Sequence, residues 1–417
     1  MFGHTFLVYA PDNRDLSFLN WTTVNFAADL RGVKWYEYVT KGVSGRFSAH
    51  YFILPLYEKI NEYRGNETRE IRFFPIKVTT KEFIRFKENI TQNKEVSFPY
   101  KFFTNNCAHG TYRILYDSLE QLPYPKNGFM SPLDVVSLLD NEHRLAAPLV
   151  MPSLLERIQN TTDSEYAELE YMEWENKQKR IRNREDREQK MINLRYSITQ
   201  REVKRPPLFV PDQKWRNPHG YSRLEIGGKL VNGQKFAHLA IRPLLHDKTD
   251  NQHFFSSTSS LEVLSTDFLF SPNNLILQSL DLVHIRSAVI YDRWFKSSVS
   301  DFYVGYQDGH SKFALGWGKS FYLASQKKVA TEVLLISSHI AGKNYLGVEI
   351  QLFSHTTGRF RYGLQGKNLF HLMSFEKTMQ FSNWCSFDLN QKHNLFLENT
   401  FDANKAGALK ISLRSYF

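Results

Sequence analysis

The chain has 417 residues, of which 42% are hydrophobic and 15% aromatic, and this length allows about two domains with cores that need no disulfide or metal support. Its formal net charge of +10 favours an anionic partner, but no nucleic-acid-binding motif accompanies the charge, so we expect no nucleic acid. Two cysteines, Cys107 and Cys385, cannot make a disulfide framework, and no run of about 18 apolar residues predicts a transmembrane helix.

Residues 1–160 predict an α+β domain, because short apolar strands alternate with segments of helical spacing. The chain opens on the strand-like motif FGHTFLVY with no visible signal peptide, and we therefore expect natural sequence upstream of it. Strands are expected in HTFLVYAP, DLSFLNWTTVNFAADL, NETREIRFFPIKV and the second half of YVTKGVSGRFSAHYFILPLYEKI. Helices are expected in TKEFIRFKENITQN, NNCAHGTYRILYDSLEQL, SPLDVVSLLD and PSLLERI.

Residues 161–215 are strongly charged, with acidic residues first and basic residues after them. This order suits the dipole of a helix and predicts a solvated helical linker. The alternative is a basic helix face that docks on anionic lipid headgroups.

Residues 216–417 contain about 12 strand-like segments separated by polar turns. The last segment alternates cleanly, with Leu409, Ile411 and Leu413 on one face and Lys410, Ser412 and Arg414 on the other. A terminal Phe after such a strand resembles the closing strand of outer-membrane barrels, although Ser415 stands where those strands usually have an apolar or aromatic residue. We predict an antiparallel β-barrel in a membrane, with a soluble β-sandwich or barrel as the alternative.

Cys107 is the candidate nucleophile of the first domain. It stands at the start of a predicted helix, where backbone N–H groups lower the pKa of a thiol and can hold an oxyanion. Asn105 or Asn106 can cap this helix, and together with His109 they are candidates for shaping the oxyanion site. The alternative is a buried structural cysteine, but the polar flanks of Cys107 disfavour it.

His4 is the candidate general base, because it lies directly before an apolar strand that can present an imidazole at the edge of a sheet. A third group must orient the imidazole. Asn25 lies on the next predicted strand and is the first choice, while Asp29, His50 and His109 are alternatives. We expect no metal and no cofactor in this site.

The order of histidine, polar residue and helix-start cysteine resembles that of circularly permuted papain-like enzymes, and NNCAH resembles the NC-x-H signature of the lecithin:retinol acyltransferase group. FGHTFL, VNFAAD, TKGVSGRF, PLYEKINEY, NETREI and FFTNNCA together resemble the Lnb N-terminal periplasmic domain family, whose Bacteroides and Bdellovibrio members are lipoprotein N-acyltransferases. NPHGYSRLEIGG and AIRPLLHD are similar to that family's C-terminal β region. The chain departs from the family in NETREI, in Thr40 before Lys41, and in lacking an N-terminal extension.

This resemblance implies a thiol-dependent acyl transfer from a glycerophospholipid, through a thioester on Cys107, to the amine of a diacylated lipoprotein. His4 would take the thiol proton, and Lys41 and Arg46 are candidates for phosphate contact, although a plain turn with solvated charges explains them equally well. The implied location is the bacterial envelope, facing the periplasm and associated with the outer membrane. Two other functions remain open: a cell-wall peptidase or amidase of the NlpC type, and a non-catalytic outer-membrane scaffold.

Overall fold

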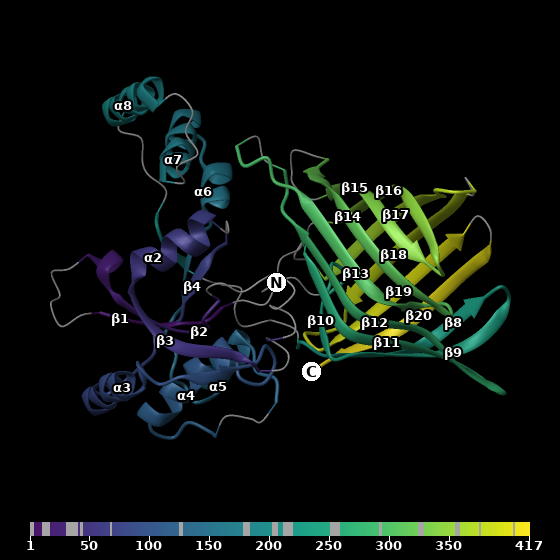
Figure 1. The fold of residues 1–417 in the computed structure, drawn as a ribbon, viewed down its shortest axis with the longest axis horizontal. Coiled ribbons are helices and arrows are strands. Elements are labelled where there is room, and N and C mark those ends of the chain that lie inside the picture. The colour runs from purple at the N-terminus through teal and green to yellow at the C-terminus, as the bar shows by residue number, and fades with distance from the viewer. Residues whose placement is uncertain are drawn as a thin grey trace. The chain divides into compact units, whose positions relative to one another are not determined.

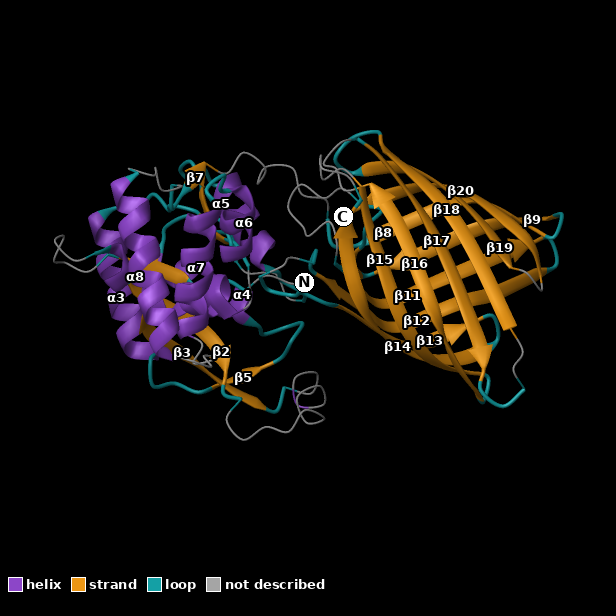
Figure 2. Ribbon diagram, turned by 90° about the horizontal axis from the view of Figure 1, so that it is seen from above, coloured by secondary structure: helices purple, strands orange, loops and turns teal. Residues whose placement is uncertain are grey.

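The structure is a computed structural model that describes residues 4–10, 17–30, 41, 45–66, 69–124, 128–177, 184–201, 207–211, 220–250, 259–291, 294–323, 329–354, 359–374, 377–402 and 405–417. The chain divides into two compact units, Phe2–Asp212 and Gln213–Phe417, and each is described by itself. The first unit mixes helices and short strands, and the second consists of long strands (Figures 1 and 2).

The first unit contains an antiparallel four-stranded sheet in the order β1-β2-β3-β5. Its strands are β1 (Leu7–Tyr9), β2 (Thr22–Ala28), β3 (Phe47–Pro55) and β5 (Phe98–Tyr100). A smaller sheet joins β4 (Ile71–Phe73), β6 (Leu149–Met151) and β7 (Val210–Pro211). The chain therefore has the α+β character expected of this domain.

The helices of the first unit begin where the sequence provides caps. Thr79, Ser131 and Ser153 each form a capping box with an acidic residue three positions on, which fixes the starts of α3, α5 and α6. The helical elements are η1 (Phe18–Asn20), α2 (Leu56–Ile60), the π-helical η2 (Asn61–Asn66), α3 (Thr80–Asn93), α4 (Cys107–Ser118), α5 (Pro132–Asn141) and α6 (Leu154–Asn160).

Helix α4 packs directly on the four-stranded sheet. Gly110 of α4 faces the ring of Phe26 on β2, and the hydroxyl of Tyr51 on β3 donates to the Gly110 carbonyl oxygen at 2.9 Å. A separate apolar cluster joins Leu56, Ile60, Tyr63, Ile71 and Met151. These contacts hold the start of α4 in a fixed place beside β2.

The charged segment is helical, as expected, but it contains two helices, α7 (Ser164–Lys177) and α8 (Arg184–Gln200). They pack on each other through Tyr166, Leu169, Met172, Met191, Leu194 and Ile198. Several cations of α8 pair with acids of α7, among them Lys190 with Glu168 at 2.6 Å and Arg195 with Glu173 at 2.9 Å. The acidic and basic blocks of the sequence therefore face each other across the helix pair.

The second unit is a closed antiparallel β-barrel, which confirms the predicted barrel. Among the described residues its sheet has thirteen strands, and twelve of them close into a ring when β9 pairs with β11. The ring consists of β8 (Arg223–Val231), β9 (Gln234–Arg242), β11 (Ser260–Ser271), β12 (Asn274–Ala288), β13 (Val299–Gln307), β14 (His310–Tyr322), β15 (Val329–Ile340), β16 (Lys343–Ser354), β17 (Phe360–His371), β18 (Lys377–Asp388), β19 (His393–Asp402) and β20 (Lys405–Tyr416).

One of the strand-like segments of the sequence, FAHLAIRPLL, forms two strands instead of one. The structure ends β9 at Arg242 and begins β10 (Leu244–His246) after Pro243. Proline has no backbone N–H to donate to a ladder, so a strand breaks there readily. β10 pairs only with β11 in the described sheet and is the thirteenth strand.

The barrel has an apolar outer wall and a polar interior. On β20, Leu409, Ile411 and Leu413 are exposed whereas Lys410, Ser412, Arg414 and Tyr416 are buried, as the alternation predicts. The same outward apolar rows recur on β14, β15, β16 and β17, for example Leu315, Trp317 and Leu335. Such a continuous apolar belt is what a bilayer requires of a barrel and is costly in water. No helix in the described part of the chain is long and apolar enough to span a membrane.

Candidate functional site

The start of α4 is fixed by the side chain of Asn106. Its Oδ1 accepts hydrogen bonds from the backbone N–H of Ala108 at 3.0 Å and of His109 at 3.3 Å. Its Nδ2 donates to the carbonyl oxygens of Phe102 at 3.0 Å and Met130 at 2.9 Å. Asn106 is therefore the N-cap residue that the sequence left open between two asparagines. It places Cys107 at the first position of the helix.

Cys107, His4 and Asn25 lie together, and His4 interacts with each of the other two. Cys107 and His4 lie close enough for each to shift the pKa of the other. His4 Nε2 is hydrogen-bonded to the side-chain Oδ1 of Asn25. A carboxamide oxygen only accepts, so Nε2 carries the proton and Nδ1 is the nitrogen left for the thiol. His4 precedes β1, Asn25 lies on β2 and Cys107 starts α4, so three separate elements bring the group together.

The pKa of each partner is shifted in the direction that favours an ion pair. Burial alone would raise the pKa of the Cys107 thiol, but the hydrogen bond and charge of His4, with the N–H groups of Thr5 and Ala108, bring it below its ordinary value. Burial alone would lower the pKa of His4, but Cys107 and Asn25 raise it above its ordinary value. A thiolate beside an imidazolium is the reactive form of a cysteine nucleophile.

The donors for an oxyanion are fewer than the sequence suggested. Asn106 takes the N–H groups of Ala108 and His109, and the Gly110 N–H bonds to the Asn106 carbonyl oxygen at 3.0 Å. Among the described residues of the first turn of α4, the backbone N–H of Cys107 is the one with no hydrogen bond to Asn106. It is therefore the group of α4 best placed to receive a developing negative charge.

Asn105 and His109 contact the loop before α4 and the helix itself. Asn105 accepts a hydrogen bond from Arg113 at 3.1 Å and donates to the carbonyl oxygen of Pro99. His109 lies between the Asn106 Oδ1, at 3.1 Å, and the Gly128 carbonyl oxygen, at 2.9 Å. Burial lowers the pKa of His109, whereas the pKa of His4 is raised. These contacts support the loop before α4. Their partners are Arg113, Pro99, Asn106 and Gly128, and not His4.

The alternatives for the orienting residue are placed elsewhere. His50 is hydrogen-bonded through Nε2 to the Ser48 hydroxyl at 2.9 Å, and the Asp29 N–H donates to the Ser48 carbonyl oxygen at 2.8 Å. Of the residues considered from the sequence, Asn25 is the one hydrogen-bonded to His4. Its side chain is buried on β2, so its position is well defined.

Lys41 and Arg46 flank a turn whose middle, residues 42–44, lies outside the described part of the chain. The Arg46 N–H donates to the Lys41 carbonyl oxygen at 3.0 Å. The side chain of Arg46 is exposed and that of Lys41 is half-buried. Their role in phosphate contact stays a prediction.

Two residues of the site were not anticipated from the sequence. The ring of Tyr63 stacks on His4 with centroids 5.9 Å apart, and Phe6 stacks on Tyr63 at the same spacing. Lys59 is buried, its Nζ lies 5.7 Å above the Tyr63 ring and 2.6 Å from Glu62, and its charge acts on His4 to lower the histidine pKa. Both residues come from α2 and η2, so only the fold brings them to His4. In the described residues no group of His, Cys, Asp and Glu side chains is arranged to hold a metal ion.

Two family models match the chain. Residues 1–142 match the Lnb N-terminal periplasmic domain, and residues 216–416 match a domain of unknown function, DUF7840. No curated protein matches the sequence.

Among solved structures, the barrel is similar to several outer-membrane proteins. The KdgM porin in complex with disordered oligogalacturonate is 7% identical, with 47% of this chain and 99% of that chain covered and a TM-score of 0.33. The NanC porin is 8% identical, with 46% and 99% covered and a TM-score of 0.33. The outer membrane protein Omp33 of Acinetobacter baumannii is 7% identical, with 48% and 100% covered and a TM-score of 0.30.

The location of the chain follows from its two halves. The first 142 residues match a periplasmic domain, and the second unit is a closed barrel with an apolar outer wall. The chain is a periplasm-facing envelope protein associated with the outer membrane.

Proposed function

We propose that the chain is a cysteine-dependent acyltransferase of the bacterial envelope. This proposal is supported by the match of residues 1–142 to the Lnb N-terminal periplasmic domain. The enzyme moves a fatty acyl chain from a glycerophospholipid to the N-terminal amine of a diacylated lipoprotein. Its first domain is a permuted papain-like domain, in which the histidine precedes the cysteine along the chain. The observation that carries this proposal is the placement of His4 beside Cys107 and hydrogen-bonded to Asn25, with the pKa of Cys107 lowered and that of His4 raised.

In the first step, the Cys107 thiolate attacks the ester carbonyl carbon of the phospholipid. The carbon–sulfur bond forms, and the negative charge on the oxygen is held by the Cys107 N–H. When the carbon–oxygen bond breaks, the imidazolium of His4 gives its proton to the leaving lysophospholipid. The products are a thioester on Cys107 and a neutral His4.

In the second step, the free amine of the lipoprotein attacks the thioester. Neutral His4 takes a proton from the amine as the carbon–nitrogen bond forms and the carbon–sulfur bond breaks. The thiolate leaves, so the ion pair with His4 is restored and an amide remains on the lipoprotein. Because the thioester is more reactive toward an amine than the parent ester, the covalent intermediate divides one hard exchange into two easier ones.

Both substrates are membrane lipids or are anchored by lipids, and this agrees with a catalytic domain on a chain that also has a membrane barrel. The net charge of +10 favours anionic headgroups at the bilayer surface. Lys41 and Arg46 are the proposed phosphate contacts, because they flank one turn of the same domain. No cofactor takes part in this scheme.

The test is a product assay with purified full-length protein in vesicles of phosphatidylethanolamine and phosphatidylglycerol. A synthetic diacylated lipopeptide with a free N-terminal cysteine amine is added, and its mass is followed. We expect the lipopeptide to gain one acyl chain with wild type and not with Cys107→Ala. The Arg46→Ala variant, changed outside the hydrogen-bonded group, is expected to keep the chemistry with a raised KM for vesicles.

Other outcomes decide against the proposal. If the lipopeptide is unchanged and muropeptides are cleaved in a Cys107-dependent way, the domain is a cell-wall hydrolase. If neither reaction occurs although a small alkylating agent modifies Cys107, the scaffold function is favoured.

A further inference from the structure

One turn of the barrel unit lies inside the barrel instead of in its wall. We call Asp247–Asp250 the inner segment, and it follows β10, which itself continues the wall by pairing with β11 on the same edge as β9. Lys248 is 8% exposed and Asp250 is fully buried. A turn with charged residues is buried to this extent only if the wall around it supplies partners.

The inner segment is bonded to opposite sides of the ring. Lys248 Nζ lies 2.6 Å from Glu332 on β15. Asp250 Oδ1 accepts hydrogen bonds from Arg223 on β8 and from the Tyr416 hydroxyl on β20, each at 2.6 Å. In the order β15-β16-β17-β18-β19-β20-β8, six steps separate β15 from β8, which is half of the twelve-strand ring. Two successive charged residues of one turn therefore span the lumen.

Thr249 binds the strands in between. Its carbonyl oxygen accepts hydrogen bonds from Arg361 on β17 at 3.2 Å and from Ser386 on β18 at 2.8 Å. Its hydroxyl oxygen accepts a hydrogen bond from Arg414 on β20 at 2.5 Å. Both the backbone and the side chain of this residue are thus held by the inner wall.

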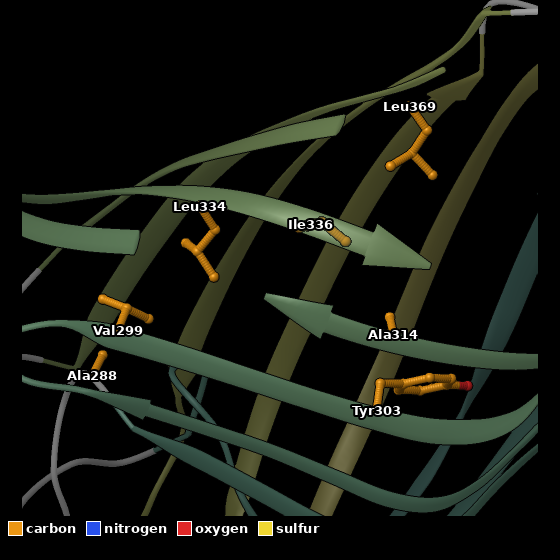
Figure 3. Packing of buried hydrophobic residues seen from close by; sticks show 7 residues of the cluster. All are labelled: Ala288, Val299, Tyr303, Ala314, Leu334, Ile336 and Leu369. Atoms are coloured by element: carbon orange, nitrogen blue, oxygen red, sulfur yellow. The ribbon is translucent and has the colours of Figure 1, made fainter. Parts of the chain in front are cut away.

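The other half of the cross-section is filled by side chains of the wall. Figure 3 shows an apolar cluster of inward residues from β12 to β17: Ala288, Val299, Tyr303, Ala314, Leu334, Ile336 and Leu369. Next to it, Arg286 of β12 reaches across to Glu332 of β15, at 3.6 Å, and to Glu349 of β16. A polar cavity of about 110 Å³ is lined by residues of β17, β18 and β19: Gln365, Lys367, Gln380, Ser382, Glu398 and Thr400.

We propose that the barrel is a sealed anchor and not a channel, and that the inner segment is its seal. The seal lies at the end of the barrel where β8 begins and β20 ends, since its partners Arg223 and Tyr416 are the first and last residues of those strands. The polar cavity is then a blind recess that no solute crosses. This inference is independent of the chemistry at Cys107 and rests only on the barrel lying in a bilayer.

The test is electrical, with the full-length protein inserted into planar lipid bilayers. The test variant replaces three residues of the seal by glycine, Lys248→Gly, Thr249→Gly and Asp250→Gly, which removes the contacts to both sides of the ring. The matched control is Asp308→Asn, in a tight turn that joins β13 and β14 at the other end of these strands. The heat-dependent shift of the band on a denaturing gel reports whether each barrel is folded.

We expect wild type and Asp308→Asn to give no discrete conductance steps, and the triple-glycine variant to give them. Conductance steps in wild type would overturn the proposal. A folded triple-glycine variant that stays silent would show that the wall side chains alone close the lumen, and would overturn the role of the inner segment. If the triple variant does not fold, Lys248→Met decides in its place, because it removes the ammonium's contacts to Glu332 and Gln351 and should give flickering currents that wild type lacks.

Discussion

Gly110 on α4 lies directly against the ring of Phe26 on β2. A Cβ atom added at position 110 would fall 2.2 Å from Cγ and 2.4 Å from Cδ1 of that ring, and Phe26 itself is fully buried. Neither residue can move without moving its element. The close approach of helix and sheet therefore sets the distance between the start of α4, which carries Cys107, and β2, which carries Asn25.

Gly110→Ala is expected to destabilise the first unit by about 1–3 kcal/mol, because an added methyl group in a filled contact forces the backbone to shift. The shift also moves Cys107 relative to His4, so the rate of thioester formation should fall further than stability alone explains. Thermal unfolding followed by the helical circular dichroism signal measures the first effect. Gly366→Ala is the matched control, since nothing lies within 4 Å of a Cβ atom there, and it should change neither quantity.

Asn25→Ala is expected to lower the rate of acyl transfer by at least about 10-fold, because the imidazole loses the acceptor that fixes its orientation. The hydrogen bond that His4 donates to Asn25 raises the pKa of His4, so its loss should also move the pH profile of the reaction to lower pH. Asn25→Asp retains an acceptor oxygen and should restore much of the rate. A structural defect alone would give a lower rate with an unchanged pH profile in both variants.

The reactivity of Cys107 toward a small alkylating agent should persist below the ordinary thiol pKa of about 8.5, because His4 lowers the pKa of this buried thiol. The rate should fall as pH drops through the lowered value. In His4→Ala only burial remains, and burial raises the pKa, so the midpoint should move above about 8.5. Site-resolved mass spectrometry measures this, with Cys385 as the internal reference. An unchanged midpoint in His4→Ala would contradict the thiolate–imidazolium pair.

Glu82 joins α3 to two other elements. Its carboxylate accepts hydrogen bonds from the Thr79 N–H at 2.8 Å and the Glu120 N–H at 3.0 Å, and Arg144 pairs with it at 3.0 Å. Burial would raise its pKa, but these backbone N–H groups, the Thr79 hydroxyl and Arg144 lower it to about 2. Because the folded pKa is lowered, this carboxylate stabilises the fold above its unfolded pKa of about 4.3 and loses that effect as pH falls toward 2.

Glu82→Gln is therefore expected to cost about 1–3 kcal/mol at pH 7, since it leaves the half-buried Arg144 guanidinium without its carboxylate and the two backbone N–H groups with a poorer acceptor. The difference from wild type should shrink when unfolding is measured below pH 4. Glu88→Gln, an exposed residue of the same helix, is the control and should have little effect at either pH. A difference that stays constant with pH would mean that the carboxylate charge is not what stabilises the fold.

The central group of the site could be predicted from the sequence because its residue types are specific. A cysteine between polar residues at a helix start is uncommon as a structural residue. A histidine before a strand adds to this, because the order of the two along the chain resembles that of circularly permuted papain-like enzymes. The alternation on β20 is equally informative, since period two with one apolar face has no other common explanation.

The rest of the site depends on contacts that no local pattern encodes. Lys59 and Tyr63 belong to an ordinary amphipathic segment, and only the position of α2 and η2 beside β1 brings them to His4. The leucine pair after Pro243 is strand, as its pattern suggests, but nothing in the local sequence shows that the turn after it, Asp247–Asp250, lies inside the barrel. Its position depends on partners on β8, β15 and β20, which are remote in the sequence.

The most direct measurement of the central claim is the intact mass of the protein after incubation with phospholipid vesicles and without a lipoprotein acceptor. We expect wild type to gain the mass of one fatty acyl chain, on Cys107, and Asn25→Ala to gain it more slowly. The adduct should be absent in Cys107→Ala and should disappear from wild type when a diacylated lipopeptide is added. An acyl adduct that persists in Cys107→Ala, or a wild type that never acquires one while its Cys107 remains alkylatable, would contradict the account.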